Sequence, residues 1–240
     1  MSTLRADNLR KSFNQRAVVE DVCIEVKSSI IAGMLGRNGA GKTTTFRMVT
    51  GLIPPDKGSV FLDDMDISYL STTQRSDKGI VYLPQENSVF MKTNVENNLK
   101  MILELKGHTK DEQEETAADL LSELGLSSLA KQPAHSLSGG ERRRLEICRA
   151  LVLKPKFLLL DEPFTGIDPL TIIELQKILK KLKNKGIGIL LSDHNVRDTL
   201  KITDYAYVID KGKILVQGTP EMIASHKKAK QKFLGEGFKL

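Results

Sequence analysis

The amino-acid sequence predicts an α/β fold with an inserted helical segment. Phe157–Leu160 and Ile187–Leu191 are short, fully apolar runs separated by a helical pattern over Leu170–Lys183, which is typical of buried parallel strands joined by a crossover helix. A glycine-rich turn at residues 36–43 joins another apolar strand to a helix. From about Thr93 to Leu153 the apolar residues recur with a helical period, so a helical insert interrupts the α/β protein.

Length and composition limit the number of domains and the class of protein. At roughly 150 residues per domain, a chain of 240 residues allows one large domain, and 40% hydrophobic with 28% charged residues is typical of a globular protein. The longest uncharged runs reach only about half of the roughly 18 residues that a membrane-spanning helix needs. Arg5 and Asp7 precede any apolar stretch, which argues against a signal peptide and predicts a cytoplasmic protein.

Neither the cysteines nor the net charge predicts a metal site or a nucleic-acid partner. Cys23 and Cys148 have no Cys or His at metal-ligand spacing, so we interpret both as reduced, buried residues. The net charge of +6 could favour nucleic acid or an anionic membrane face, but the first basic block is His226–Lys232. We interpret the excess as a solvated surface and expect no nucleic-acid partner.

The first sixty residues predict strands on both sides of the glycine-rich turn. β-Branched residues are frequent over Val18–Val26, and Ile30–Leu35 forms a second such segment, so the chain is expected to open with a small sheet. A helix over Gly41–Val49 follows the turn, and the loop Pro54–Gly58 leads to a strand at Ser59–Leu62.

Two later elements have clear boundaries. Thr109 and Glu112 form a capping box that starts a helix in the inserted segment, and Gly125 is a candidate for its end. Near the C-terminus, Tyr205–Ile209 and Lys213–Val216 predict a hairpin.

Residues 36–43 match the phosphate-loop pattern G-x-x-x-x-G-K-[ST], between the strand and the helix that this motif requires. Glycines let backbone N–H groups close around phosphate oxygens, and the helix adds the positive end of its dipole. Lys42 supplies a charge to the phosphates, and the Thr43 hydroxyl can ligate Mg²⁺. The alternative is a glycine-rich turn without a ligand, which the flanking elements disfavour. The predicted nucleotide-binding residues are Gly36, Asn38, Gly39, Ala40, Gly41, Lys42, Thr43 and Thr44.

The strand Phe157–Leu160 leads into two carboxylates. Asp161 can hold the hydration shell of Mg²⁺, while Glu162, one residue on, can face the water that attacks the γ-phosphate. Glu162 is therefore the candidate general base. A strand that simply ends in solvated charges is the alternative, which the preceding phosphate loop disfavours.

The segment Ser136–Arg144 decides among nucleotide-binding folds. Taken alone, Ser138 and Glu141 could be only a capping box. Between a phosphate loop and an acidic strand end, Leu-Ser-Gly-Gly-Glu resembles the signature of the ATP-binding cassette (ABC) ATPases, and the resemblance covers nearly the whole chain. It implies a P-loop NTPase with a RecA-like core, an N-terminal antiparallel β subdomain and an inserted α-helical subdomain.

The resemblance also implies a division of the chain. It gives one ABC ATPase domain over residues 1–240. The α/β core with its β subdomain occupies residues 1–90 and 155–225, the helical signature subdomain residues 91–154, and a C-terminal tail residues 226–240.

Further site residues follow from the resemblance. Gln85 is similar to the Q-loop glutamine that touches Mg²⁺, and His194 to the switch histidine that contacts the γ-phosphate. Thr165–Pro169 resembles the D-loop. Phe13 fits the aromatic that stacks on adenine, with an ordinary core or edge phenylalanine as the alternative. The implied catalytic set is Lys42, Gln85, Glu162 and His194, and the implied metal set is Thr43, Gln85 and Asp161.

Cassettes of this family close head to tail on two MgATP. Because the chain has one signature and one phosphate loop, the resemblance implies that Ser138, Gly139, Gly140 and Glu141 complete the ATP site of a second copy. It also implies integral membrane subunits that dock near Gln85–Met91, and a place at the inner face of the cytoplasmic membrane.

Within the family, the runs that begin at Ser192 and Phe233 are most similar to the ATPases that power lipopolysaccharide export. The motor of a branched-chain amino acid importer is the alternative, and a soluble nucleic-acid-associated ABC ATPase is a remote one. A regulator that binds nucleotide without hydrolysis is disfavoured because Glu162 and His194 are both present. Arg37 and Ile167 depart from the residues common in the family, and neither replaces a reacting group.

Overall fold

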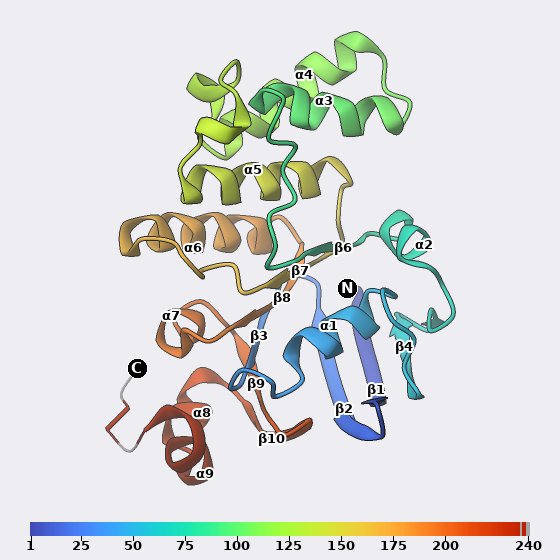
Figure 1. Ribbon diagram of the computed structural model, residues 1–240, viewed down its shortest axis with the longest axis vertical. Helices are drawn as coiled ribbons and strands as arrows, with labels where there is room; N and C mark the ends of the chain where they lie inside the picture. Colours follow the sequence, from blue (N-terminus) through green and yellow to red (C-terminus); the bar gives the residue numbers. More distant parts are fainter. Residues whose placement is uncertain (236, 239–240) are drawn as a thin grey trace.

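The computed structural model describes residues 1–235, 237 and 238, which form two sheets and their surrounding helices (Figure 1). The first sheet is antiparallel, with the strand order β2-β1-β4-β5. Its strands are β1 (Thr3–Phe13), β2 (Arg16–Lys27), β4 (Lys57–Leu62) and β5 (Met65–Asp66).

The second sheet has the order β10-β9-β3-β8-β7-β6 and is parallel except for the hairpin of β9 and β10. Because the carboxyl ends of parallel strands share one edge of a sheet, the loops after these strands meet there. The strands are β3 (Ile31–Leu35), β6 (Ile80–Leu83), β7 (Phe157–Asp161), β8 (Gly188–Asp193), β9 (Tyr205–Asp210) and β10 (Lys213–Gly218).

The prediction that Ile30–Leu35 belongs to the opening sheet is wrong. Ile31–Leu35 pairs in parallel with β8 and β9 and lies in the second sheet. All of its residues are buried, as expected of a central parallel strand, whereas β2 places buried and exposed residues on alternate faces near its end. Cys23 lies on the outer face of β2 and is exposed, so the prediction of two buried cysteines holds only for Cys148.

The helices include those predicted over Gly41–Val49 and Leu170–Lys183, each of which begins and ends within one residue of the expected position. Thr109 caps α4 as expected, its N–H donating to Glu112 Oε2 at 2.8 Å. The α-helices are α1 (Lys42–Val49), α2 (Thr72–Asp77), α3 (Val95–Leu105), α4 (Lys110–Glu123), α5 (Gly139–Val152), α6 (Pro169–Asn184), α7 (Val196–Leu200), α8 (Pro220–Ser225) and α9 (Lys227–Ala229). Shorter helical turns cover Ser127–Leu129, Ala134–Ser136 and Lys230–Leu234.

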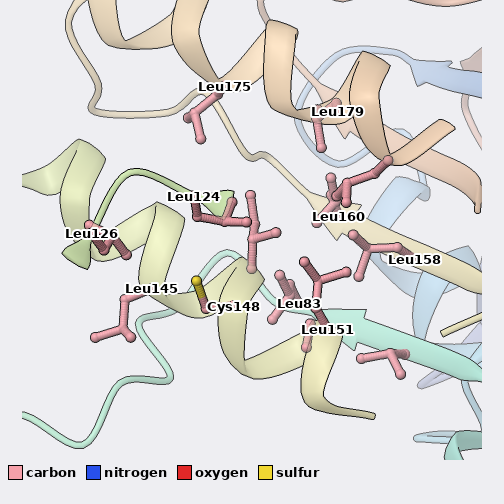
Figure 2. Close-up of a cluster of buried hydrophobic side chains, with 14 of the residues drawn as sticks. Leu83, Leu124, Leu126, Leu145, Cys148, Leu151, Leu158, Leu160, Leu175 and Leu179 are labelled. Atoms are coloured by element: carbon pink, nitrogen blue, oxygen red, sulfur yellow. The ribbon is translucent and has the colours of Figure 1, made fainter. Parts of the chain in front are cut away.

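A leucine-rich cluster joins the inserted helices to the parallel sheet (Figure 2). Cys148 and Leu151 of α5 lie near Leu83 of β6 and Leu158 of β7, and Leu179 of α6 belongs to the same cluster. Each fully buried leucine stabilises the fold by roughly 1.5–3 kcal/mol. This packing fixes α5 against the strand that carries the predicted acidic residues.

The C-terminal segment packs on the opposite end of the molecule from α3 and α4 (Figure 1). Phe233 and Leu234 contact a small cluster that includes Leu200 and Val208. Residues 236, 239 and 240 of the predicted tail lie outside the described residues. In the part of the chain that is described, no helix has both the length and the apolar character to span a membrane.

Candidate functional site

The phosphate loop forms a cavity of about 290 Å³ after the carboxyl end of β3. Gly39 and Gly41 have φ angles of 77° and 109°, which favour glycine. A Cβ on Gly36 would lie 2.5 Å from the backbone oxygen of Ile209, so glycine is required for this close approach. The lining residues are Val18, Asn38, Gly39, Gly41, Lys42, Thr43, Thr44, Gln85 and Glu162, which includes most of the predicted set but neither Gly36 nor Ala40.

Lys42 lines this cavity and is 5% exposed. Its Nζ donates to the backbone oxygens of Gly36 at 2.8 Å and Arg37 at 3.3 Å. An ammonium group has three donors, so one remains for a ligand in the cavity. Burial lowers the pKa of Lys42, and the nearby Glu162 and Asp161 carboxylates act in the opposite direction.

Asp161 ends β7 and is buried, with a hydrogen-bond donor on each carboxylate oxygen. Ser192 Oγ donates to Oδ1, because the parallel register of β7 and β8 places the two residues side by side. Tyr82 Oη donates to Oδ2 at 3.2 Å from the neighbouring strand β6. The carboxylate of Asp161 is therefore held in one orientation.

Glu162 has a φ of 47°, a conformation that non-glycine residues seldom adopt. Its N–H donates to Ser192 O at 2.8 Å, so β8 holds the turn in place. Glu162 Oε2 accepts from Gln85 Nε2 at 3.1 Å and from Thr165 Oγ1 at 3.0 Å, and lies 3.3 Å from His194 Nδ1. The structure thus brings together Gln85, Glu162 and His194, which three separate loops supply.

Asp193 holds the loop that carries His194. Its carboxylate is buried and accepts from the N–H groups of Phe164 at 3.0 Å and Asn195 at 2.8 Å. Burial raises the pKa of Asp193, and these two hydrogen bonds oppose the rise. Asp193 Oδ1 also lies 3.6 Å from His194 Nδ1. The hydrogen bond from Phe164 ties the loop that carries the histidine to the segment after Glu162.

The signature segment forms the start of α5. Ser138 caps this helix in a capping box with Glu141, and hydrogen bonds to Ser138 lower the pKa of the Glu141 carboxyl group. A Cβ added to Gly140 would lie 2.1 Å from Thr171 Cγ2, so this glycine allows α5 to meet the start of α6. None of Ser138–Glu141 is among the described residues that line the phosphate-loop cavity.

Phe13 ends β1 with 45% of its surface exposed, which excludes a place in the core. Lys11 Nζ lies 5.8 Å from the centre of its ring. The exposed ring is free to stack on a planar group.

A second, larger cavity of about 630 Å³ lies beside α2, and we call it the α2 cavity. Thr43 and Gln85 line both cavities, and Asp161 and Tyr82 line this one. Beyond Gln85, Val89 is buried, whereas Phe90 is 46% exposed. The remaining lining residues are Arg47, Thr50, Leu52, Ile53, Thr72, Ser76, Ile80, Val81, Pro84, Glu86 and Leu153.

Comparison with known proteins identifies the architecture. The sequence profile of the family described as "ABC transporter" matches residues 19–165, more than half of the chain. The chain belongs to the ABC transporter ATPase family. As an ABC ATPase it binds and hydrolyses ATP, and its fold is that of an ABC nucleotide-binding domain with an antiparallel β subdomain.

The ABC ATPase has similar relatives over its full length. It is 48% identical to "Lipopolysaccharide export system ATP-binding protein LptB" of Haemophilus influenzae and 47% identical to the protein of that name of Escherichia coli strain K12, with 100% of each chain covered. It also matches the crystal structure of the ADP conformation of MJ1267, an ATP-binding cassette of an ABC transporter. That match has a TM-score of 0.88 and 28% identity, and covers 98% of this chain and 100% of the other.

The motifs of the ABC ATPase did not reveal Tyr82 and Ser192 as partners of Asp161, or the part played by Asp193. Ser192 and Asp193 directly precede His194, so their position beside a motif residue was a usable signal. Tyr82 stands three residues before Gln85, but its contact with Asp161 depends on the order of strands in the sheet and could not be predicted from that position.

Proposed function

We propose that this ABC ATPase powers lipopolysaccharide export through separate membrane subunits. The observation that carries the proposal is identity of 47–48% over the whole of both chains with relatives named as ATPases of that system. A match that extends through the first and last residues is stronger support than shared phosphate-loop and signature motifs.

In this proposal each residue of the site has a separate role in ATP hydrolysis. Lys42, with one donor left over, binds the β- and γ-phosphates together with the backbone N–H groups of the loop. Glu162 accepts the proton of the attacking water, while Gln85 and His194, both beside its Oε2, orient that water and the γ-phosphate. Phe13 stacks on the adenine ring.

Thr43, Gln85 and Asp161 are the residues that would hold Mg²⁺. Their hydroxyl, amide and carboxylate oxygens are the donors this ion prefers, and all three line the α2 cavity where it adjoins the phosphate loop. Held by these residues, Mg²⁺ would supply positive charge to offset that of the phosphates.

A second copy completes each site. Ser138, Gly139, Gly140 and Glu141 lie away from the cavity of their own chain, and the free start of α5 offers N–H groups to an anion. Two chains that close head to tail place this segment over the γ-phosphate of the partner copy.

The α2 cavity and Phe90 form the docking surface for the membrane subunits. Leu52 and Phe90 are exposed, and Leu52 and Ile53 line the cavity, which favours a partner segment with an apolar face. This contact holds the chain at the inner face of the cytoplasmic membrane.

The test is to deplete the chain in its native host and to purify a tagged copy from the membranes. We expect lipopolysaccharide to accumulate in the inner membrane, and the tagged chain to carry integral membrane subunits of the exporter. The Glu162→Gln variant should be captured with the same subunits but should not restore export. Unchanged lipopolysaccharide distribution, or capture of amino acid importer subunits, would refute the proposal.

A further inference from the structure

We propose that Tyr82 is a positioning residue for the Mg²⁺ site, which holds the Asp161 carboxylate from the wall of the α2 cavity. The inference rests on the proposed placement of Mg²⁺ at Thr43, Gln85 and Asp161. It adds a residue that belongs to none of the phosphate-loop, signature or switch motifs.

The two donors on Asp161 act from opposite sides. Ser192 Oγ holds Oδ1 and Tyr82 Oη holds Oδ2 at 3.2 Å, so neither oxygen can rotate out of place without losing a hydrogen bond. Asp161 itself is 1% exposed, and leaving a buried acceptor without its donor is costly. Hydrogen bonds of this kind orient metal-binding carboxylates, and their removal typically weakens metal binding by about 10–100-fold.

The ring of Tyr82 is fixed by packing. Its centre lies 6.3 Å from that of Phe46, at an interplanar angle of 57°. Phe46 belongs to α1, the helix that also presents Lys42 and Thr43 to the phosphate cavity. The phenol therefore contacts two parts of the nucleotide site at once, the helix of the phosphate loop and the acidic end of β7.

Tyr82 is also the point at which the α2 cavity reaches the metal site. Its side chain lines the cavity together with Arg47 and Gln85, and its hydroxyl group bonds to Asp161, which lines the same cavity. A group that enters the cavity and displaces the phenol would release Oδ2 of Asp161.

The first test measures metal affinity without turnover. Mn²⁺ binding to the ADP-bound protein is followed by electron paramagnetic resonance for wild type, Tyr82→Phe and Tyr207→Phe. Tyr207 is the matched control, a buried tyrosine whose Oη bonds to the backbone N and O of Glu25, each at 2.9 Å. We expect at least about tenfold weaker Mn²⁺ binding for Tyr82→Phe and wild-type binding for Tyr207→Phe.

A second test observes Tyr82 itself in the wild-type sequence, so it does not depend on the folding of the Tyr82→Phe variant. The chain has 4 tyrosines, and 3-fluorotyrosine incorporation gives each a ¹⁹F resonance. Single Tyr→Phe changes at Tyr69, Tyr205 and Tyr207 assign the Tyr82 signal by elimination. Adding Mg²⁺ to the ADP-bound protein should shift the Tyr82 resonance and leave that of Tyr69, which is 98% exposed, in place.

The outcomes separate the two proposals. If wild type binds Mn²⁺ with ADP but Tyr82→Phe binds it equally well, or the Tyr82 resonance does not respond to Mg²⁺, the positioning role is wrong and the metal site stands. If wild type binds no Mn²⁺ with ADP, the proposed metal site falls and the role of Tyr82 falls with it.

Discussion

We expect phosphate binding to depend most on Lys42, because it is a buried cation that lines the cavity and two carbonyl groups fix its position. We expect Lys42→Ala to lower MgATP hydrolysis by about 100-fold or more, since charge on the phosphates would go uncompensated. Phosphate release measures the effect, with Lys177→Ala on the exposed face of α6 as the control. Near wild-type turnover in Lys42→Ala would contradict the assignment.

A change at Phe13 tests the predicted contact with the adenine ring of ATP. If its exposed ring stacks on adenine, Phe13→Ala should weaken ATP binding by about 1–3 kcal/mol, the range seen for aromatic stacking on nucleic-acid bases. Calorimetric titration measures the dissociation constant. Phe90→Ala, a change at another exposed phenylalanine, should leave it unaltered. An unchanged constant for Phe13→Ala would show that the ring makes no contact with the nucleotide.

At the scale of elements, α2 is joined to the phosphate-loop helix by one buried side chain. Arg75 is 1% exposed and donates to the terminal carbonyls of α1, at Met48 O (2.8 Å) and Val49 O (2.7 Å). It also donates to Ser68 O and Leu70 O. Burial lowers the pKa of Arg75 to about 10, so the guanidinium stays charged at neutral pH.

Removing this link should destabilise the fold. We expect Arg75→Ala to reduce the free energy of unfolding by about 3 kcal/mol or more, because hydrogen bonds from a charged donor contribute roughly 1.5–3 kcal/mol each. Denaturant titration measures the change. Arg16→Ala, at an exposed position of β2, should stay within about 0.5 kcal/mol of wild type. A loss equally small in Arg75→Ala would mean that the two helices do not depend on the guanidinium.

The elements that the sequence predicted well are those whose signals are local. The capping residues Thr109 and Glu112, and the apolar period of α6, define helices without reference to the rest of the chain. Sheet membership is not local, because β3 joins the parallel sheet through strands more than 150 residues away. The polar helix Thr72–Asp77 carries no apolar period and was not predicted, although its Ser71–Gln74 capping box was present in the sequence.

Across the whole molecule, the site residues also divide into those with a local sequence signal and those whose contacts depend on long-range strand pairing. The sequence singles out Lys42, Glu162 and His194 because each follows a strand in a recognisable motif. The contact between Tyr82 and Asp161 spans 79 residues and follows only from the placement of β6 beside β7. The sequence therefore predicts which loops carry the chemistry, while the sheet decides what holds each side chain in place.

A prediction at this scale concerns two chains. If Glu162 is the general base, Glu162→Gln keeps the binding groups but removes the base, so this variant should bind ATP without turnover and accumulate the ATP-bound dimer. Adding Ser138→Arg should abolish that dimer, since a bulky side chain at the start of α5 would block the γ-phosphate of the partner copy. Light scattering with and without ATP measures the mass. Ser128→Arg, at an exposed site of the helical segment, is the matched control and should still dimerise. If Glu162→Gln combined with Ser138→Arg dimerises as strongly as Glu162→Gln combined with Ser128→Arg, the signature segment does not contact the ATP of the partner copy.

The unequal exposure of the two cysteines has a practical consequence. A thiol reagent that cannot unfold the protein meets Cys23 on the outer face of β2, while Cys148 is shielded within the leucine-rich cluster. Burial also raises the pKa of the Cys148 thiol, so little reactive thiolate forms there. The wild-type chain thus carries its own single attachment point for a fluorophore, and the approach of two labelled copies can be followed without altering any residue.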